Sequence, residues 1–332
     1  MDIEPKLKLF KDWIPARVYI SDSEPLVDWC YMGSERFIQP FFDDTIERRF
    51  RKPFNLVFRH QTSFRFLERL YNESPGVYPT GFIFHMSRCG STLVTQMLAA
   101  IEKNIVISEA SPIDIVLGLN SKLPISDADR SARLQWIISA LGQRRHPDEE
   151  SYFIKFDCWA TLDLELIRKA FPDVPWIFIY RDPLEVIVSH MRQRGWQMIP
   201  GTIDKMLPDI NIAEALQLSP EEYCARVLRE ICEYALGHAE DKTALLVNYD
   251  QLPDAVVDLV LDHFRVSFTD DEIERMKEVT KFHAKSPRIF FSSDREEKRK
   301  SASKAIIEAA DEWVSRPYRL LEQMRSTGSI AL

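Results

Sequence analysis

GFIFHMSRCGSTLVTQM, from Gly81 to Met97, sets the architecture of the chain, because an apolar run leads directly into a short polar loop and a second apolar run. This order predicts a strand, a loop and a helix. Gly90 lets the loop backbone approach a ligand closely, and the amides of residues 89–92 are expected to point outward at the positive end of the helix. The segment therefore predicts an anion site, with phosphate as its natural occupant.

The predicted loop differs from the P-loop of nucleotide triphosphatases, which has Gly, four residues, Gly, Lys and then Ser or Thr. If Gly90 is the second glycine, His85 stands at the position of the first and Ser91 at the position of the lysine. The cation that holds a β- and γ-phosphate is therefore missing from its usual place. The cation of this loop is Arg88, two residues before Gly90.

A second strand, turn and helix are predicted at residues 176–192, WIFIYRDPLEVIVSHMR. The apolar start is typical of a buried parallel strand, Asp182 is a suitable N-cap, and Pro183 suits the first helical position. Ser189 lies seven residues, or about two helical turns, after Asp182 and so faces the loop that carries Arg181. Arg181 and Ser189 are therefore predicted to hold one anion between them.

Both segments resemble the donor-binding motifs of sulfotransferases. The first resembles the 5′-phosphosulfate loop of that family through Arg88, Cys89, Gly90, Ser91 and Thr92. Arg181 and Ser189 stand eight residues apart, as do the Arg and Ser of the family's 3′-phosphate motif. The resemblance implies 3′-phosphoadenosine-5′-phosphosulfate (PAPS) as co-substrate, 3′-phosphoadenosine-5′-phosphate (PAP) as product, and no metal. In motif spacing the sequence is most similar to the bacterial and Golgi tyrosylprotein branch.

The resemblance also implies catalytic residues. The Golgi tyrosylprotein branch has its catalytic Glu twenty-one residues after the loop Arg, and Glu109 has that spacing from Arg88. Family members carry a Lys at the position of Lys155, and cytosolic ones have a catalytic His two residues later, where this sequence has Asp157. We therefore predict Glu109 as the base, with Lys155 and Arg88 neutralising charge on the sulfuryl group. Asp157 is the alternative base, and Glu109 as a mere cap of the helix beginning near Ser111 is the structural alternative.

The predicted reaction is in-line transfer of a sulfuryl group from PAPS to a hydroxyl or amine of a small-molecule, glycan or peptide acceptor. Two other functions fit the same motifs. A small-molecule kinase would use a P-loop scaffold with ATP and magnesium, and the missing lysine argues against it. A non-catalytic nucleotide-binding protein would account for the absence of His at the position of Asp157.

The alternation of apolar strands with helical segments between Thr80 and His190 predicts an α/β fold, a parallel sheet with helices on both faces. We expect residues 76–332 to form this sulfotransferase-like P-loop domain, with a helical C-terminal part. Residues 1–75 mix aromatic, acidic and basic residues with little periodicity and form an N-terminal extension of unknown role. This extension could cap the pocket, form an oligomer interface or, as we expect, add a layer to the sheet.

Two segments of the second half carry open alternatives. Arg295–Met324 is predicted to be an amphipathic helix that is interrupted or ended near Pro317. Its first six residues, REEKRK, could supply cations to the 3′-phosphate, but a solvated helix face explains them better. Residues 195–212 could form a lid or an acceptor loop, and Trp196 could stack on an acceptor or cover the sheet edge.

The composition indicates a globular protein without a membrane or nucleic-acid partner. The chain has 332 residues, 45% of them hydrophobic, and a polar start unlike a secretory signal. No apolar run approaches the roughly 20 residues of a membrane span, so we expect a cytoplasmic protein. The net charge of −8 gives no reason to expect nucleic acid. The five cysteines lack ligand spacing, which argues against zinc, and the sequence is compatible with an oligomer.

Overall fold

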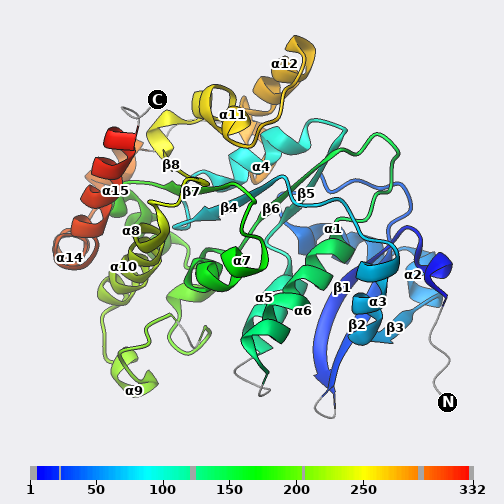
Figure 1. The fold of residues 1–332 in the computed structure, drawn as a ribbon. Helices are drawn as coiled ribbons and strands as arrows, with labels where there is room; N and C mark the ends of the chain where they lie inside the picture. Colours follow the sequence, from blue (N-terminus) through cyan, green and yellow to red (C-terminus); the bar gives the residue numbers. More distant parts are fainter. Residues whose placement is uncertain (1–5, 22–23, 120–124, 204–205, 291–294, 329–332) are drawn as a thin grey trace.

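The computed structural model of the protein describes residues 6–21, 24–119, 125–203, 206–290 and 295–328. Its centre is a five-stranded parallel sheet with the strand order β5-β6-β4-β7-β8 (Figure 1). Its strands are β4 (Gly81–His85), β5 (Asn104–Ser108), β6 (Ser151–Lys155), β7 (Trp176–Tyr180) and β8 (Ala244–Asn248). Every residue of β4, β5 and β7 is buried, as expected for parallel strands covered on both faces. The predicted fold class is confirmed.

Helices cover both faces of the parallel sheet (Figure 1). Above the sheet in that view lie α4 (Ser91–Ala99), α11 (Leu261–His263) and α12 (Asp270–Val279). Below it lie α5 (Ser111–Gly118), α6 (Asp127–Leu141), α7 (Leu164–Ala170), α8 (Pro183–Arg192) and α10 (Pro220–His238), with the short α9 (Ile212–Ala215) further out. Helix α8 begins at Pro183 as predicted, and α4 begins at Ser91, directly after Gly90. The Asp182 side chain caps α8 by accepting from the amide of Leu184 at 2.9 Å.

The N-terminal region forms a separate three-stranded antiparallel sheet with the order β1-β2-β3. Its strands are β1 (Trp13–Ser21), β2 (Glu24–Tyr31) and β3 (His60–Ser63), accompanied by α1 (Phe42–Phe50), α2 (Pro53–Val57) and α3 (Arg65–Glu73). This sheet packs through β1 on α5 and α6, and α3 also packs on α6. It therefore adds its layer outside these helices and not directly on the central sheet.

The C-terminal part consists of a hairpin and three helices. The hairpin joins β9 (Phe282–His283) to β10 (Ser286–Phe290), and the helices are α13 (Arg295–Lys300), α14 (Lys304–Ala309) and α15 (Ser315–Gly328). Pro317 does not end the helical segment, because α15 continues past it. A π-helical turn at Ala310–Val314 interrupts the α-helix just before α15. Pro317 cannot donate to the carbonyl of Trp313, and its ring crowds that carbonyl, which a widened turn relieves. A break that the sequence did not predict precedes Ser303, which caps α14.

No helix among the described residues has both the length and the apolar character that crossing a membrane requires.

Candidate active site

A cavity of about 790 Å³ opens where the strands of the parallel sheet end. The loops after β4, β5, β6 and β7 contribute to its walls, because the carboxyl ends of parallel strands meet at one sheet edge. Helix α13 and the segment between α12 and β10 line it as well. The residues predicted for the donor site and for the base that line this cavity are Arg88, Cys89, Gly90, Ser91, Thr92, Glu109, Asp157, Arg181 and Ser189. The structure thus brings together both motifs and the predicted base.

The loop between β4 and α4 is built from left-handed backbone. Ser87, Arg88 and Gly90 have φ values of 77°, 50° and 87°. A side chain at Gly90 would place its Cβ 2.8 Å from carbon atoms of Leu252 and Tyr249, so only glycine fits there. Successive turns of this kind form a concave nest of backbone amides, which suits an anion. The clustering of sparsely populated conformations is typical of functional sites.

Glu109 lies directly after β5, where its backbone is also left-handed with a φ of 53°. Its amide donates to the carbonyl of Lys155 at 2.7 Å, which extends the pairing of β5 with β6 by one residue. The side chains of these two residues meet, with Lys155 Nζ 2.8 Å from Glu109 Oε1. The side chain of Lys155 is completely buried, and that of Glu109 is 20% exposed toward the cavity. Lys155 therefore stands behind Glu109, where its ammonium also donates to Thr92 Oγ1 at 3.4 Å.

His85 is a member of this cluster that the sequence analysis missed as a functional residue. Its Nδ1 accepts from the amide of Ser87 at 3.1 Å, so the proton of the neutral ring lies on Nε2. Nε2 in turn contacts the carbonyl of Phe156 at 3.1 Å and Glu109 Oε1 at 3.3 Å. Burial lowers the pKa of His85, although the carboxylate of Glu109 opposes this. A polar residue at the end of an otherwise apolar strand was the signal that could have identified it.

The surroundings shift the pKa values of the two predicted base candidates in opposite directions. Burial raises the pKa of Glu109, but the charge of Lys155 and the hydrogen bond from His85 outweigh it and hold that pKa well below its usual range. Burial raises the pKa of Asp157 well above its usual value, and the nearby carboxyls of Asp114 and Glu109 raise it further. The pair with Lys155 thus favours the ionised form of Glu109, whereas the surroundings of Asp157, which hydrogen-bonds with Asp114, favour its protonated form.

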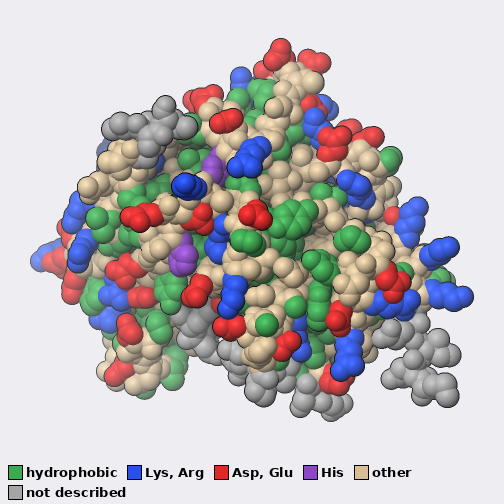
Figure 2. Space-filling model, in the orientation of Figure 1, with side chains coloured by type: hydrophobic (Ala, Val, Ile, Leu, Met, Phe, Trp, Pro, Cys, Tyr) green, Lys and Arg blue, Asp and Glu red, His purple; other side chains and the backbone are tan. Residues whose placement is uncertain are grey.

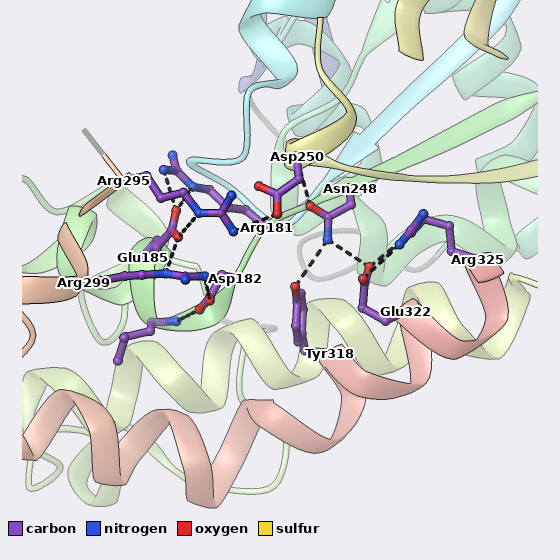
Figure 3. A network of polar contacts seen from close by, with 11 residues as sticks. Arg181, Asp182, Glu185, Asn248, Asp250, Arg295, Arg299, Tyr318, Glu322 and Arg325 are labelled. Carbon is purple, nitrogen blue, oxygen red and sulfur yellow. Dashed lines mark hydrogen bonds and ion pairs between the residues drawn. The ribbon is translucent and has the colours of Figure 1, made fainter. Parts of the chain in front are cut away.

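The other end of the cavity is a network of ion pairs centred on Glu185 (Figure 3). Arg181 Nη2 lies 2.6 Å from Glu185 Oε2, and the Arg181 guanidinium stacks on the ring of Tyr249 at 4.0 Å from its centroid. Arg295 and Arg299, both from α13, contact the other oxygen of Glu185 at 3.0 and 2.9 Å. The carboxylate of Glu185 is thus shared by three guanidinium groups while its side chain is only 1% exposed.

Helix α13 is only in part the solvated helix that the sequence analysis favoured. Glu296 and Lys300 are largely exposed and pair with each other at 3.5 Å. The prediction is wrong for Arg295 and Lys298, because both line the cavity and Lys298 is only 6% exposed. A helix made up entirely of charged residues does not reveal from sequence which of its faces meets another part of the protein.

Aromatic side chains surround the remaining part of the cavity wall. Phe41, from the N-terminal region, lies between two amines, with its ring centroid 5.0 Å from Lys155 Nζ and 5.3 Å from Lys285 Nζ. Trp159 and the predicted Trp196 also line the cavity, and Trp196 is 71% exposed. The N-terminal region therefore contributes directly to the wall of the site.

No group of three or more metal-ligating side chains could hold a metal ion among the residues that the structure describes.

Comparison with known proteins gives structural matches only. No family model and no curated protein matches the sequence. The sulfotransferase domain from the curacin biosynthetic pathway has a TM-score of 0.44 and 18% identity, covering 75% of this chain and 97% of that one. Sulfotransferase STF9 from Mycobacterium avium has a TM-score of 0.44 and 13% identity, covering 74% and 80%. Mouse sulfotransferase SULT7A1, complexed with PAP, has a TM-score of 0.37 and 11% identity, covering 80% and 90%.

All three structures are sulfotransferases, the family that the motifs around Arg88 and Arg181 resemble. They do not distinguish one branch of that family from another. With TM-scores below 0.5 and identities of at most 18%, these matches carry no inference about the chemistry of this chain.

Proposed function

We propose that the protein is a sulfotransferase that moves a sulfuryl group from PAPS to a hydroxyl or amine acceptor. The observation that supports this most is the meeting, in one cavity, of an amide-rich loop, a second cationic turn and an ionised carboxylate paired with a buried lysine. A volume of about 790 Å³ is within the usual range for a site that encloses a small molecule.

The donor would bind with its two anionic ends at the two motifs. The amides of residues 89–92 and the guanidinium of Arg88 would hold the 5′-phosphosulfate. Arg181 and Ser189 would hold the 3′-phosphate, and the position of Arg295 and Lys298 on the cavity wall supports a contribution from α13. In this arrangement the donor needs no metal ion for its binding.

Glu109 would act as the base. Its carboxylate takes the proton of the acceptor as the acceptor oxygen or nitrogen attacks sulfur in line with the bridging oxygen of the donor. The new bond to sulfur forms while the bond from sulfur to the phosphate oxygen breaks, and PAP leaves with that electron pair. Lys155 and Arg88 would offset the charge that builds on the bridging and sulfuryl oxygens.

The pair formed by Lys155 and Glu109 suggests how the base gains strength. Without donor, Lys155 holds the pKa of Glu109 low, which makes a weak base. Sulfuryl oxygens in the site would draw the ammonium of Lys155 toward themselves. Glu109 would then lose part of the positive charge that stabilises its ionised form, and its pKa would rise once the donor is in place.

The test replaces each carboxyl by its amide and measures transfer from labelled PAPS, after an acceptor has been found by screening metabolite and glycan pools. Glu109→Gln should lower kcat by about 10²- to 10⁴-fold without weakening PAP binding. Asp157→Asn should keep most of the rate, because burial and the neighbouring carboxyls of Asp114 and Glu109 raise the pKa of Asp157 and disfavour the ionised form that a base needs. If Asp157→Asn abolished transfer and Glu109→Gln did not, Asp157 would be the base.

One observation favours a nucleotide-binding protein without catalysis, namely that Lys155 and Glu109 neutralise each other in the described structure. This second candidate predicts tight PAP binding by calorimetry and no transfer to any acceptor in the same screens. Dependence on ATP and magnesium would instead favour a kinase.

A further inference from the structure

A short segment of the N-terminal region exposes apolar side chains to an unusual degree. Residues 51–59, RKPFNLVFR, include α2, and eight of these nine residues are exposed. The exposed fractions of its large apolar residues are 45% for Phe54, 54% for Leu56, 72% for Val57 and 54% for Phe58. We call residues 51–59 the basic apolar segment. In Figure 1, α2 lies at the end of the molecule opposite α14 and α15.

The one buried residue of the segment is polar, and it fixes the segment in place. Asn55 is 1% exposed, its Oδ1 accepts from the amide of Tyr31 at 2.9 Å, and its Nδ2 donates to the carbonyls of Tyr31 and Arg49, both at 3.0 Å. The ring of Phe54 packs on that of Phe58 at a centroid distance of 4.8 Å. The polarity is thus the reverse of that of a water-facing turn, with the amide inside and the apolar groups outside.

The exposed apolar side chains are surrounded by positive charge. Residues 48–67 contain six Arg or Lys and no Asp or Glu, in a chain whose net charge is −8. Arg49 pairs with Glu35, and Arg51 lies 3.6 Å from Glu47, with both side chains of this second pair mostly exposed. Figure 2 shows Lys and Arg side chains projecting from the edge of the molecule where Figure 1 draws α2.

We infer that the basic apolar segment is a membrane-contact site for anionic lipids. Phe54, Leu56, Val57 and Phe58 would enter the boundary between head groups and acyl chains, while the flanking cations contact the negative head groups. This differs from spanning the bilayer, and it revises the expectation that the protein has no membrane partner. A second copy of the chain fits the surface less well, because a two-fold interface there would bring the same cations together.

Vesicle co-sedimentation of the full chain tests this inference. The protein should bind vesicles of phosphatidylcholine and phosphatidylglycerol at about three to one, and should bind pure phosphatidylcholine much more weakly. Raising the salt from about 0.1 M to about 1 M should release most of it, because the screening length falls from about 10 Å to about 3 Å.

Two pairs of variants separate the apolar and the charged contributions. Leu56→Asp combined with Val57→Asp should abolish binding, and Lys52→Glu combined with Arg59→Glu should weaken it by at least about 25-fold, at about fivefold per cation. The matched controls are Leu216→Asp, at a residue that is 67% exposed, and Lys300→Glu combined with Lys304→Glu, whose side chains are 80% and 88% exposed. Both controls should bind like the unchanged protein.

Three results would overturn the inference. The first is no binding to anionic vesicles, and the second is control variants that bind vesicles as weakly as the test variants. The third is a dimer of the unchanged protein in solution that is lost only when Leu56→Asp and Val57→Asp are combined. Circular dichroism and PAP calorimetry on each variant would show that the fold is kept. None of these variants changes a residue that lines the cavity. Absence of membrane binding would therefore not argue against the proposed sulfuryl transfer, and absence of sulfuryl transfer would not argue against membrane binding.

Discussion

The two ends of the cavity provide positive potential by different means. At the end near Gly90, the backbone itself is shaped, through left-handed residues and the start of α4. At the end near Arg181, guanidinium groups from the turn after β7 and from α13 share the carboxylate of Glu185 in α8 (Figure 3). The first arrangement depends on a local sequence and on the absence of a side chain, whereas the second depends on segments more than 100 residues apart. The two ends should therefore respond differently to substitution.

The largest expected effect comes from breaking the backbone end with Gly90→Ala. The left-handed conformation costs about 1–2 kcal/mol for a residue with a Cβ, and the contacts with Leu252 and Tyr249 add to it. We expect affinity for PAP and for adenosine 5′-phosphate to fall together, by about 10- to 100-fold, in calorimetry. Gly237→Ala, where an added Cβ meets nothing within 4 Å, is the control. Unchanged binding by the Gly90 variant would show that no phosphate lies on this loop.

The next effect tests the side-chain end with Arg181→Ala. Loss of a charged hydrogen-bonding partner of the 3′-phosphate should weaken PAP by about 10- to 100-fold, at about 1.5–3 kcal/mol for a charged hydrogen bond. Adenosine 5′-phosphate lacks that group and should bind as before. If both nucleotides weakened equally, Arg181 would support the pocket without contacting the 3′-phosphate.

A smaller effect should follow from His85→Gln, between the two ends. Burial lowers the pKa of His85, so the stability that its neutral ring contributes is present above the unfolded pKa of about 6.5 and is lost as the pH falls through the folded pKa. Gln does not titrate, so the difference in free energy of unfolding between the two proteins should shrink from pH 7.5 to pH 5. The variant should also raise the pKa of Glu109, which loses a hydrogen bond to its carboxylate.

Denaturant unfolding at the two pH values measures the first effect, and the acid limb of the rate profile measures the second. His190→Gln serves as the control. Burial also lowers the pKa of His190, to about 3, but His190 does not contact Glu109. A rate profile of His85→Gln identical to that of the unchanged protein would argue against His85 as a positioning residue for Glu109.

The smallest effect is expected for Arg299→Ala. The side chain of Arg299 is 47% exposed, and Glu185 retains Arg181 and Arg295 as partners. Affinity for PAP should fall by no more than about fivefold, in keeping with a surface ion pair of up to about 1 kcal/mol. Lys300→Ala is the matched control. A tenfold loss with Arg299→Ala would mean that α13 closes the 3′-phosphate end through this residue.

The sequence predicted the motif elements well because their signals are local. The strand, glycine turn and helix around Gly90, and the Asp182 cap followed by Pro183, depend on residues that are neighbours in the chain. The N-terminal region was not predicted as a sheet, because its residues show little periodicity and β3 pairs with β2 across a segment from 32 to 59 that contains α1 and α2. Phe41 could not be recognised as part of the cavity for the same reason.

Residue types and spacing by themselves determined the α/β class and the two strand, turn and helix segments, since helix caps, glycine turns and apolar runs act over a few residues. The choice of Glu109 came from the resemblance to sulfotransferases and stays a prediction. The tertiary structure alone decided the directions in which the pKa values of Glu109 and Asp157 shift, the place of His85 beside Glu109, and the burial of Lys298. These depend on burial and on the field of charges brought together from distant segments, and neither is encoded in the order of neighbouring residues.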